Sequence, residues 1–305
     1  MLKKPVVFLL CMLSLSGFAQ QKTSLQKGEN NIQIPFELTE YNNLLMQVVL
    51  NHKDSLKLMF HSAADAINLT EEATNRVKLD YSRTDSVKSW GGNNNTSRYS
   101  ENNQLQMGAL HFDKLSIWED KNSGQHSDGK FGMNLFDGHV VAIDFEKKIL
   151  TLSETLPTDI ASYTKHKLIA ENGYLFLAAN SVIGKETIPN KYLIHSGYAG
   201  AILYDDEFVS KHQISEKIKI THEKELKDSF GNVLKTQKGI TSKFSIDEID
   251  LSQVPVGFFT GALSRQKMSI LGGDMLKRFQ IVYDLERSHI YLKANQLAKL
   301  DYSNF

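Results

Sequence analysis

The sequence FGMNLF at residues 131–136 recurs in altered form, as LGGDML at residues 271–276. Each copy is a glycine turn followed by a short helical pattern and a β-hairpin of alternating apolar residues. Asp144 and Asp284 take matching places in the two hairpins, which favours a structural turn role for both. The ungapped alignment continues through three pairs: VVAID (140–144) with QIVYD (280–284), Glu146-Lys147 with Glu286-Arg287, and ILTL (149–152) with HIYL (289–292).

A second pair of matching segments lies upstream of the first. LMFHSAA at residues 58–64 aligns with YLIHSGY at residues 192–198. Each is an apolar strand that enters a small polar turn, and a helical pattern follows each, over residues 70–77 and 205–212. Thr70 has the residue type and position of a helix N-cap. The chain is therefore an internal duplication.

Turn signals divide the rest of each copy into short strands. Gly91-Gly92, Gly231-Asn232 and Asn172-Gly173 predict hairpin turns. The segment 154–164, which contains Pro157, interrupts the strand pattern. Two mostly-β units of about 130 residues predict an all-β fold with short helices and two lobes. We place the first lobe at residues 31–154 and the second at residues 165–295.

The first nineteen residues have the pattern of a secretory signal peptide. Lys3 and Lys4 precede an apolar run, and Ala19 supplies the small residue before the expected cleavage point. The run is about half of the ~20 residues that a membrane span needs. We expect an exported protein, periplasmic or secreted, without a membrane span.

Composition excludes several kinds of chemistry. Cys11 is the only cysteine and lies inside the leader, so the mature chain would have neither a disulfide nor a thiol nucleophile. Removing Lys3 and Lys4 from the 35 basic residues leaves 33 against 35 acidic ones. This balance gives no electrostatic reason to expect nucleic acid as a partner. No cofactor is implied, and the oligomeric state stays open.

The paired turns resemble those of two-lobed aspartic proteases of the retropepsin and pepsin type. In that family each lobe has an Asp-Thr/Ser-Gly turn and a later apolar-apolar-Gly turn. The first turns here are His61-Ser62-Ala63 and His195-Ser196-Gly197, and the later turns end at Gly132 and Gly272. The resemblance spans nearly the whole mature chain and implies that His61 and His195 occupy the positions of the catalytic aspartate pair.

The resemblance also implies roles for the neighbouring residues. Ser62 and Ser196 would tie the two facing loops together through their hydroxyls, and Gly197 would keep the tight turn. Ala63 must fit a backbone position that the family gives to glycine. Gly91 and Gly92 would belong to a hairpin that covers the cleft.

Replacing both aspartates by histidine changes the charge of the site. Two close carboxylates share one proton, so the family's pair carries a charge near −1. Two imidazoles with an ordinary pKa of ~6.5 carry 0 or +1 instead. We therefore expect the peptidase chemistry to be lost and the inter-lobe cleft to bind an extended peptide or another ligand.

Two other functions stay open. The protein is alternatively an active hydrolase with a histidine-based or metal-assisted site, because neutral imidazole is a common metal ligand. A metal on His61 and His195 would need a further ligand, and no motif such as HExxH supplies one. The third alternative is a structural component of the cell envelope. Among the other histidines, we expect His52, His166 and His289 to lie on the surface, and Asp274 to cap a helix.

Overall fold

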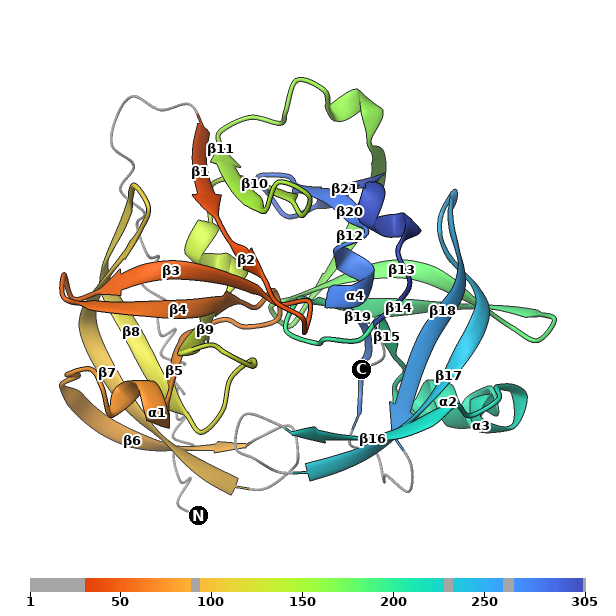
Figure 1. Ribbon diagram of the computed structural model, residues 1–305, viewed down its shortest axis with the longest axis horizontal. Helices are drawn as coiled ribbons and strands as arrows, with labels where there is room; N and C mark the ends of the chain where they lie inside the picture. The colour runs from red at the N-terminus through yellow and green to blue at the C-terminus, as the bar shows by residue number, and fades with distance from the viewer. Residues whose placement is uncertain (1–30, 89–93, 228–232, 260–265, 304–305) are drawn as a thin grey trace, which may run out of the picture.

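The computed structural model describes residues 31–303 except 89–93, 228–232 and 260–265, so the predicted leader lies outside it. Figure 1 shows two β-rich lobes side by side, with a sheet that joins them across the top of the view. Helices are short. The predicted all-β, two-lobed fold is confirmed.

The first lobe is built on an eight-stranded sheet whose order is β2-β3-β4-β9-β5-β8-β7-β6. Its elements are β2 (Glu37–Leu38), β3 (Leu44–Leu50), β4 (Asp54–Phe60), β5 (Ile67–Thr70), α1 (Glu71–Thr74), β6 (Tyr81–Lys88), β7 (Asn94–Met107), β8 (Leu110–Asp120), β9 (Gly129–Phe131) and the 3-10 helix η1 (Met133–Phe136).

The second lobe repeats this arrangement in the order β13-β14-β19-β15-β18-β17-β16. Its elements are β13 (Tyr174–Ile183), β14 (Glu186–His195), β15 (Ile202–Leu203), α2 (Asp206–Lys211), α3 (Ile214–Lys217), β16 (His222–Lys227), β17 (Val233–Ile246), β18 (Ile249–Phe259), β19 (Ser269–Gly272) and α4 (Gly273–Leu276).

Six strands join the lobes in the order β1-β11-β10-β20-β21-β12. Ala142 of β10 lies opposite Val282 of β20, and these residues are equivalent in the sequence repeat. The pseudo-twofold axis of the duplication therefore passes between them. The joining elements are β1 (Asn31–Pro35), β10 (Val140–Asp144), β11 (Ile149–Ser153), η2 (Ile160–Ser162), β12 (Thr164–Glu171), β20 (Phe279–Tyr283), β21 (His289–Ala294) and η3 (Gln296–Lys299).

Both lobes contain an equivalent pair of parallel strands. β4 runs parallel to β9, and β14 runs parallel to β19. Alternate side chains of these strands face the main core: Phe60 and Phe131 in the first lobe, Ile194 and Leu271 in the second. The ends of β4 and β14 meet in the middle of the molecule, between the two lobes.

Local signals in the sequence match the structure at several turns. Thr70 caps α1 by accepting a hydrogen bond from Ala73 N, and Asp205 caps α2 in the same way. Asp284 accepts hydrogen bonds from Ser288 N and His289 N, which closes the β20–β21 turn.

Two predictions about side chains were wrong. Asp274 lies inside α4 rather than at its cap, fully buried, where it pairs with Lys277 at 2.8 Å and accepts from Ser303 N. His166 is buried rather than exposed, with Nδ1 2.5 Å from Asp247. Asp274 is held by Ser303 and His166 by Asp247, both distant in the sequence, and a local pattern does not reveal such contacts.

Candidate functional site

The candidate site forms where β4 and β14 end, at His61 and His195. The rings lie side by side, with centroids 4.4 Å apart and planes inclined at 59°. His61 packs against Gly197, whose added Cβ would lie 2.3 Å from the imidazole Cδ2. Glycine at position 197 is therefore needed for the ring of the opposite lobe to fit.

The serines that follow the histidines tie the two turns together. Ser62 N donates to Ser196 Oγ at 2.9 Å, and Ser196 N donates to Ser62 Oγ at 3.0 Å. Each hydroxyl then donates to a strand carbonyl of the other lobe, Ser62 to Ile194 O and Ser196 to Phe60 O, both at 2.7 Å. The network is symmetric and holds the rings in one relative position.

Gly132 and Gly272 allow a close backbone crossing behind each turn. A Cβ on Gly132 would lie 2.0 Å from Ala64 O, and one on Gly272 would lie 2.2 Å from Gly200 O. Both distances are far below van der Waals contact. Ala63, in contrast, has no positive φ, so its Cβ fits this turn without backbone strain.

The two imidazoles lie in a poorly solvated environment. Each residue keeps some exposed surface, but the Nδ1 atom of each ring is buried and has no hydrogen-bond partner among the described residues. Burial lowers the pKa of His195 to about 4. Burial, followed by the neighbouring His195, lowers the pKa of His61 well below its usual value. Both rings are therefore neutral at pH 7.

Lys130 adds a positive charge beside this pair. Its ammonium group lowers the pKa of both histidines. Lys130 stands in β9 one residue before Phe131, where the sequence departs from the apolar-apolar-Gly pattern. It forms an ion pair with Asp120 at 2.6 Å, and both side chains are largely buried. With both rings neutral and Lys130 paired with Asp120, the centre of the site lacks the net negative charge of a carboxylate pair.

Two asparagines that the sequence did not single out hold the turns from the first lobe. Asn43 Nδ2 donates to Ser196 O at 3.1 Å, and Asn42 Nδ2 donates to Ala199 O at 2.7 Å. Lys277 donates to Asn42 Oδ1. An Asn-Asn pair between strands is typical of a turn, so its sequence carries no signal of this inter-lobe role.

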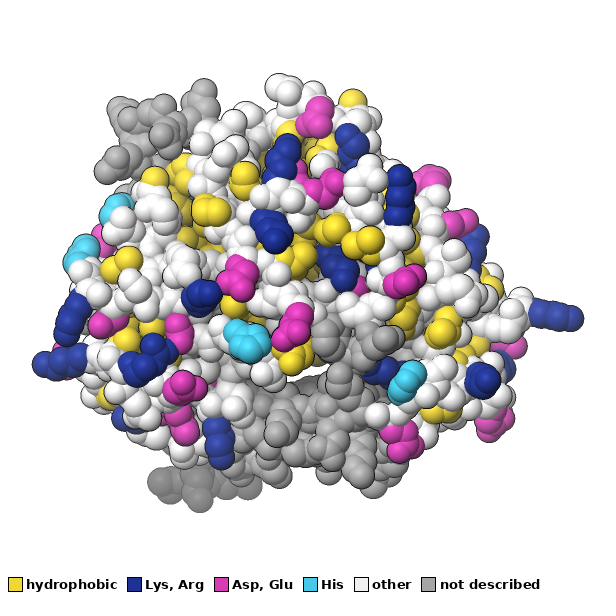
Figure 2. Space-filling model, viewed as in Figure 1, with side chains coloured by type: hydrophobic (Ala, Val, Ile, Leu, Met, Phe, Trp, Pro, Cys, Tyr) yellow, Lys and Arg dark blue, Asp and Glu magenta, His cyan; other side chains and the backbone are white. Residues whose placement is uncertain are grey.

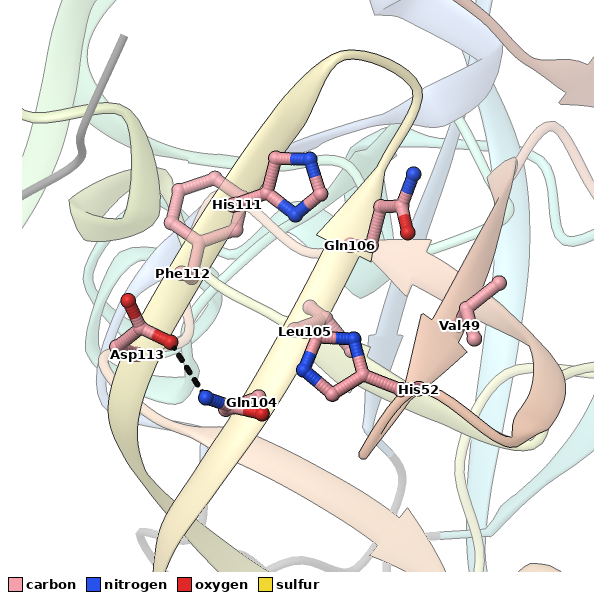
Figure 3. A pocket seen from close by; sticks show the side chains of 8 residues that line it. All are labelled: Val49, His52, Gln104, Leu105, Gln106, His111, Phe112 and Asp113. Carbon is pink, nitrogen blue, oxygen red and sulfur yellow. Dashed lines mark hydrogen bonds between the residues drawn. The ribbon is translucent and has the colours of Figure 1, made fainter. Parts of the chain in front are cut away.

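The described residues hold no cluster of three or more His, Cys, Asp or Glu side chains suited to a metal ion. A pocket on the first lobe is lined by His52 and His111, with Gln104 hydrogen-bonded to Asp113 (Figure 3). It encloses only about 10 Å³, about enough for one water molecule. This pocket includes neither His61 nor His195.

A long hairpin extends from each lobe toward the lower edge of the view in Figure 1. The first is β6–β7 and the second is β16–β17, and each of β6 and β16 is the last strand of its sheet. Gly91 and Gly92, predicted for a covering hairpin, lie outside the described residues, between β6 and β7. Figure 2 shows an opening between the lobes near the middle of this lower side.

Comparison with solved structures agrees with the two-lobed fold. The structure of an aspartic proteinase from Irpex lacteus superposes with a TM-score of 0.60 at 12% sequence identity, over 88% of this chain and 98% of that one. The fold is that of an aspartic proteinase. No protein-family model and no curated protein sequence matches the chain. Among the described residues, no helix combines the length and apolar character needed to cross a membrane.

Proposed function

We propose that this protein binds an extended peptide between the two lobes of an aspartic-proteinase fold and does not cleave it. The observation that carries the proposal is the pair of close imidazoles with buried, unpartnered Nδ1 atoms at the centre of an intact serine network. Buried polar atoms are nearly always hydrogen-bonded, so these two Nδ1 atoms mark an incompletely satisfied site. Each ring keeps some exposed surface, and polar groups of a ligand would bind there.

The charge of the site argues against aspartic-type peptide hydrolysis. In that chemistry one ionised carboxylate activates water while its protonated partner hydrogen-bonds the substrate carbonyl. Here His61 and His195 are neutral at pH 7, and protonation at lower pH makes the pair positive rather than negative. Lys130 opposes that protonation. The pair therefore never carries the negative charge that the reaction uses.

The fold favours binding of an extended strand. β6 and β16 are sheet edges, and an edge presents unpaired backbone N–H and C=O groups. A peptide that lies between the lobes gains backbone hydrogen bonds from such edges, while side-chain pockets supply specificity.

The test is an assay of cleavage and binding with the same purified mature protein. Casein and a library of short peptides are incubated at several pH values, with and without added zinc. We expect peptide capture without cleavage, and loss of capture in the His195→Ala variant. Metal-free cleavage that His195→Ala abolishes would overturn the proposal, and zinc-dependent cleavage would favour a metal-assisted hydrolase.

Export is part of the proposal and rests on residues 1–19. We further propose that the lobe boundary lies within residues 154–164. Mass spectrometry of the mature N-terminus in cell fractions tests the first statement. Cleavage near Ala19 and recovery outside the cytoplasm are expected, whereas an intact leader in the cytoplasm would refute it.

A further inference from the structure

The two lobes differ in one layer of side chains beside the histidine pair. Strand pairing places Lys130 of β9 opposite Asn68 of β5, and it places Ile270 of β19 opposite Leu203 of β15. β9 and β19 are equivalent strands of the duplication. Lys130 thus takes the place of Ile270, and Asn68 takes the place of Leu203.

A third pair of equivalent positions follows from the neighbouring strands. Asp120 lies two residues beyond the β8 partner of Asn68, and Phe259 lies two residues beyond the β18 partner of Leu203. Side chains two residues apart in a strand point to the same face. Asp120 is therefore the first-lobe counterpart of Phe259.

These positions make an apolar layer in one lobe and an ionic layer in the other. In the second lobe Leu203, Phe259 and Ile270 pack together, with Tyr198 against them, apart from the main core. In the first lobe Lys130 and Asp120 form their ion pair at 2.6 Å. Lys130 adjoins Phe131 in its strand and faces away from the main core, on the side of the histidine pair.

We propose that the peptide ligand places an acidic side chain against Lys130 and an apolar side chain against Phe259 and Ile270, the two members of the apolar layer that keep some exposed surface. This inference rests on the peptide-binding function proposed above and names its specificity. Lys130 is the more exposed member of its pair, with 14% of its side chain accessible against 7% for Asp120. Most of the accessible surface of this ion pair therefore belongs to Lys130.

The neutral histidine pair is what makes an acidic ligand acceptable here. A carboxylate pair would repel an anionic side chain placed beside it, because like charges at short range raise the energy of both. Neutral imidazoles exert no such repulsion. The one charged side chain that lowers the pKa of both rings is Lys130.

The test measures which peptides the mature protein selects. A positional-scanning library of short peptides is captured on immobilised protein, and the best binder is remade with Glu→Gln at its acidic position. We expect enrichment of peptides with an acidic and an apolar residue, and roughly tenfold weaker binding of the Gln peptide, as for loss of one charged hydrogen bond. The difference should shrink as salt is raised.

A charge-exchange variant locates the contact. Lys130→Asp combined with Asp120→Lys keeps an ion pair but reverses its direction, and it should shift the preference from acidic toward basic peptides. The matched control exchanges Lys57 and Glu37, an exposed pair at 2.8 Å in the same lobe, and should leave selectivity unchanged.

The outcomes separate this inference from the proposed function. Peptide binding with no preference for an acidic residue, or a preference that the exchange leaves unchanged, overturns the inference alone. Absence of any peptide binding overturns the proposed function with it. Where the exchange variant does not fold, the Glu and Gln peptides on the unaltered protein decide the question.

Discussion

Ser62 and Ser196 each accept a hydrogen bond from the backbone N–H of the other. Each hydroxyl also donates to a carbonyl of the opposite lobe, so four backbone groups depend on two side chains. Ser196 is buried and Ser62 is partly so. These bonds are the most direct link between the turns that carry the histidines.

Removing either hydroxyl should destabilise the protein. Ser62→Ala or Ser196→Ala leaves a buried N–H and a buried carbonyl without partners, at a cost of about 1–3 kcal/mol in unfolding free energy. Denaturant unfolding measures it, and the exposed Ser55→Ala serves as control. Because both serines belong to one network, the double variant should lose less than the sum. Strict additivity would show that the hydroxyls act independently.

Stability should fall as the pH is lowered from about 6.5 to about 4. The folded pKa of His195, about 4, is below the ordinary value near 6.5, so in this window the unfolded chain binds a proton that the folded chain does not. The loss for His195 is about 3 kcal/mol when complete, and above pH 6.5 this histidine contributes no pH dependence. His61, whose pKa is also lowered, acts in the same direction.

Unfolding at a series of pH values checks this prediction. His195→Gln should make the unfolding free energy less dependent on pH between pH 4 and 6.5. His52→Asn, at an exposed turn with positive φ, should leave that pH dependence unchanged. An unchanged slope in the His195 variant would mean that this ring titrates as freely in the folded chain as in the unfolded one.

The glycines at the backbone crossings should not tolerate a side chain. Gly132→Ala and Gly272→Ala each place a Cβ about 2 Å from a carbonyl oxygen, so backbone must move and we expect a loss of about 3 kcal/mol or more. Gly184→Asn is the control, since nothing lies within 4 Å of its added Cβ and Asn tolerates its φ of 63°. Thermal melting measures the loss of stability. Equal changes in melting temperature for the three variants would contradict the prediction.

Introducing two carboxylates should produce some hydrolysis at acid pH. The double variant His61→Asp with His195→Asp creates a pair that shares one proton, held by the same serine network. We expect peptide cleavage at about pH 4 that neither single variant shows, because the reaction needs one ionised and one protonated carboxyl. Cleavage of labelled peptides measures it. A double variant that folds but stays inactive would show that Lys130 or another part of the site also blocks the chemistry.

The fold could be predicted because its signals are local and repeated. The glycine turn at Gly132 and its copy at Gly272 have fixed spacing to the following hairpins, and alternation of apolar residues shows which strand faces are buried. The position of His61 beside His195 followed from the resemblance of the two turns. Each of these features depends on residues close together in the chain.

The surroundings of the histidine pair could not be predicted in the same way. The charge of Lys130 acts on the rings because β9 pairs with β4, and its partner Asp120 comes from a third strand. Asn43 reaches Ser196 across more than half of the chain. Contacts between distant segments leave no periodicity in one sequence, so the sign of the charge near the rings appears only in the folded structure.

The pairing of β10 with β20 has a consequence for how such a chain can arise and assemble. Because Ala142 faces its own counterpart Val282, the seam between the halves is self-complementary, as in a twofold dimer. A half produced alone would present the open edge of β10 or β20 to any like half. The linker around Pro157 then acts mainly by raising the effective concentration of one half near the other. Each half can therefore pair with a second copy of a half through this strand edge. A fragment that contains one half should dimerise rather than stay monomeric.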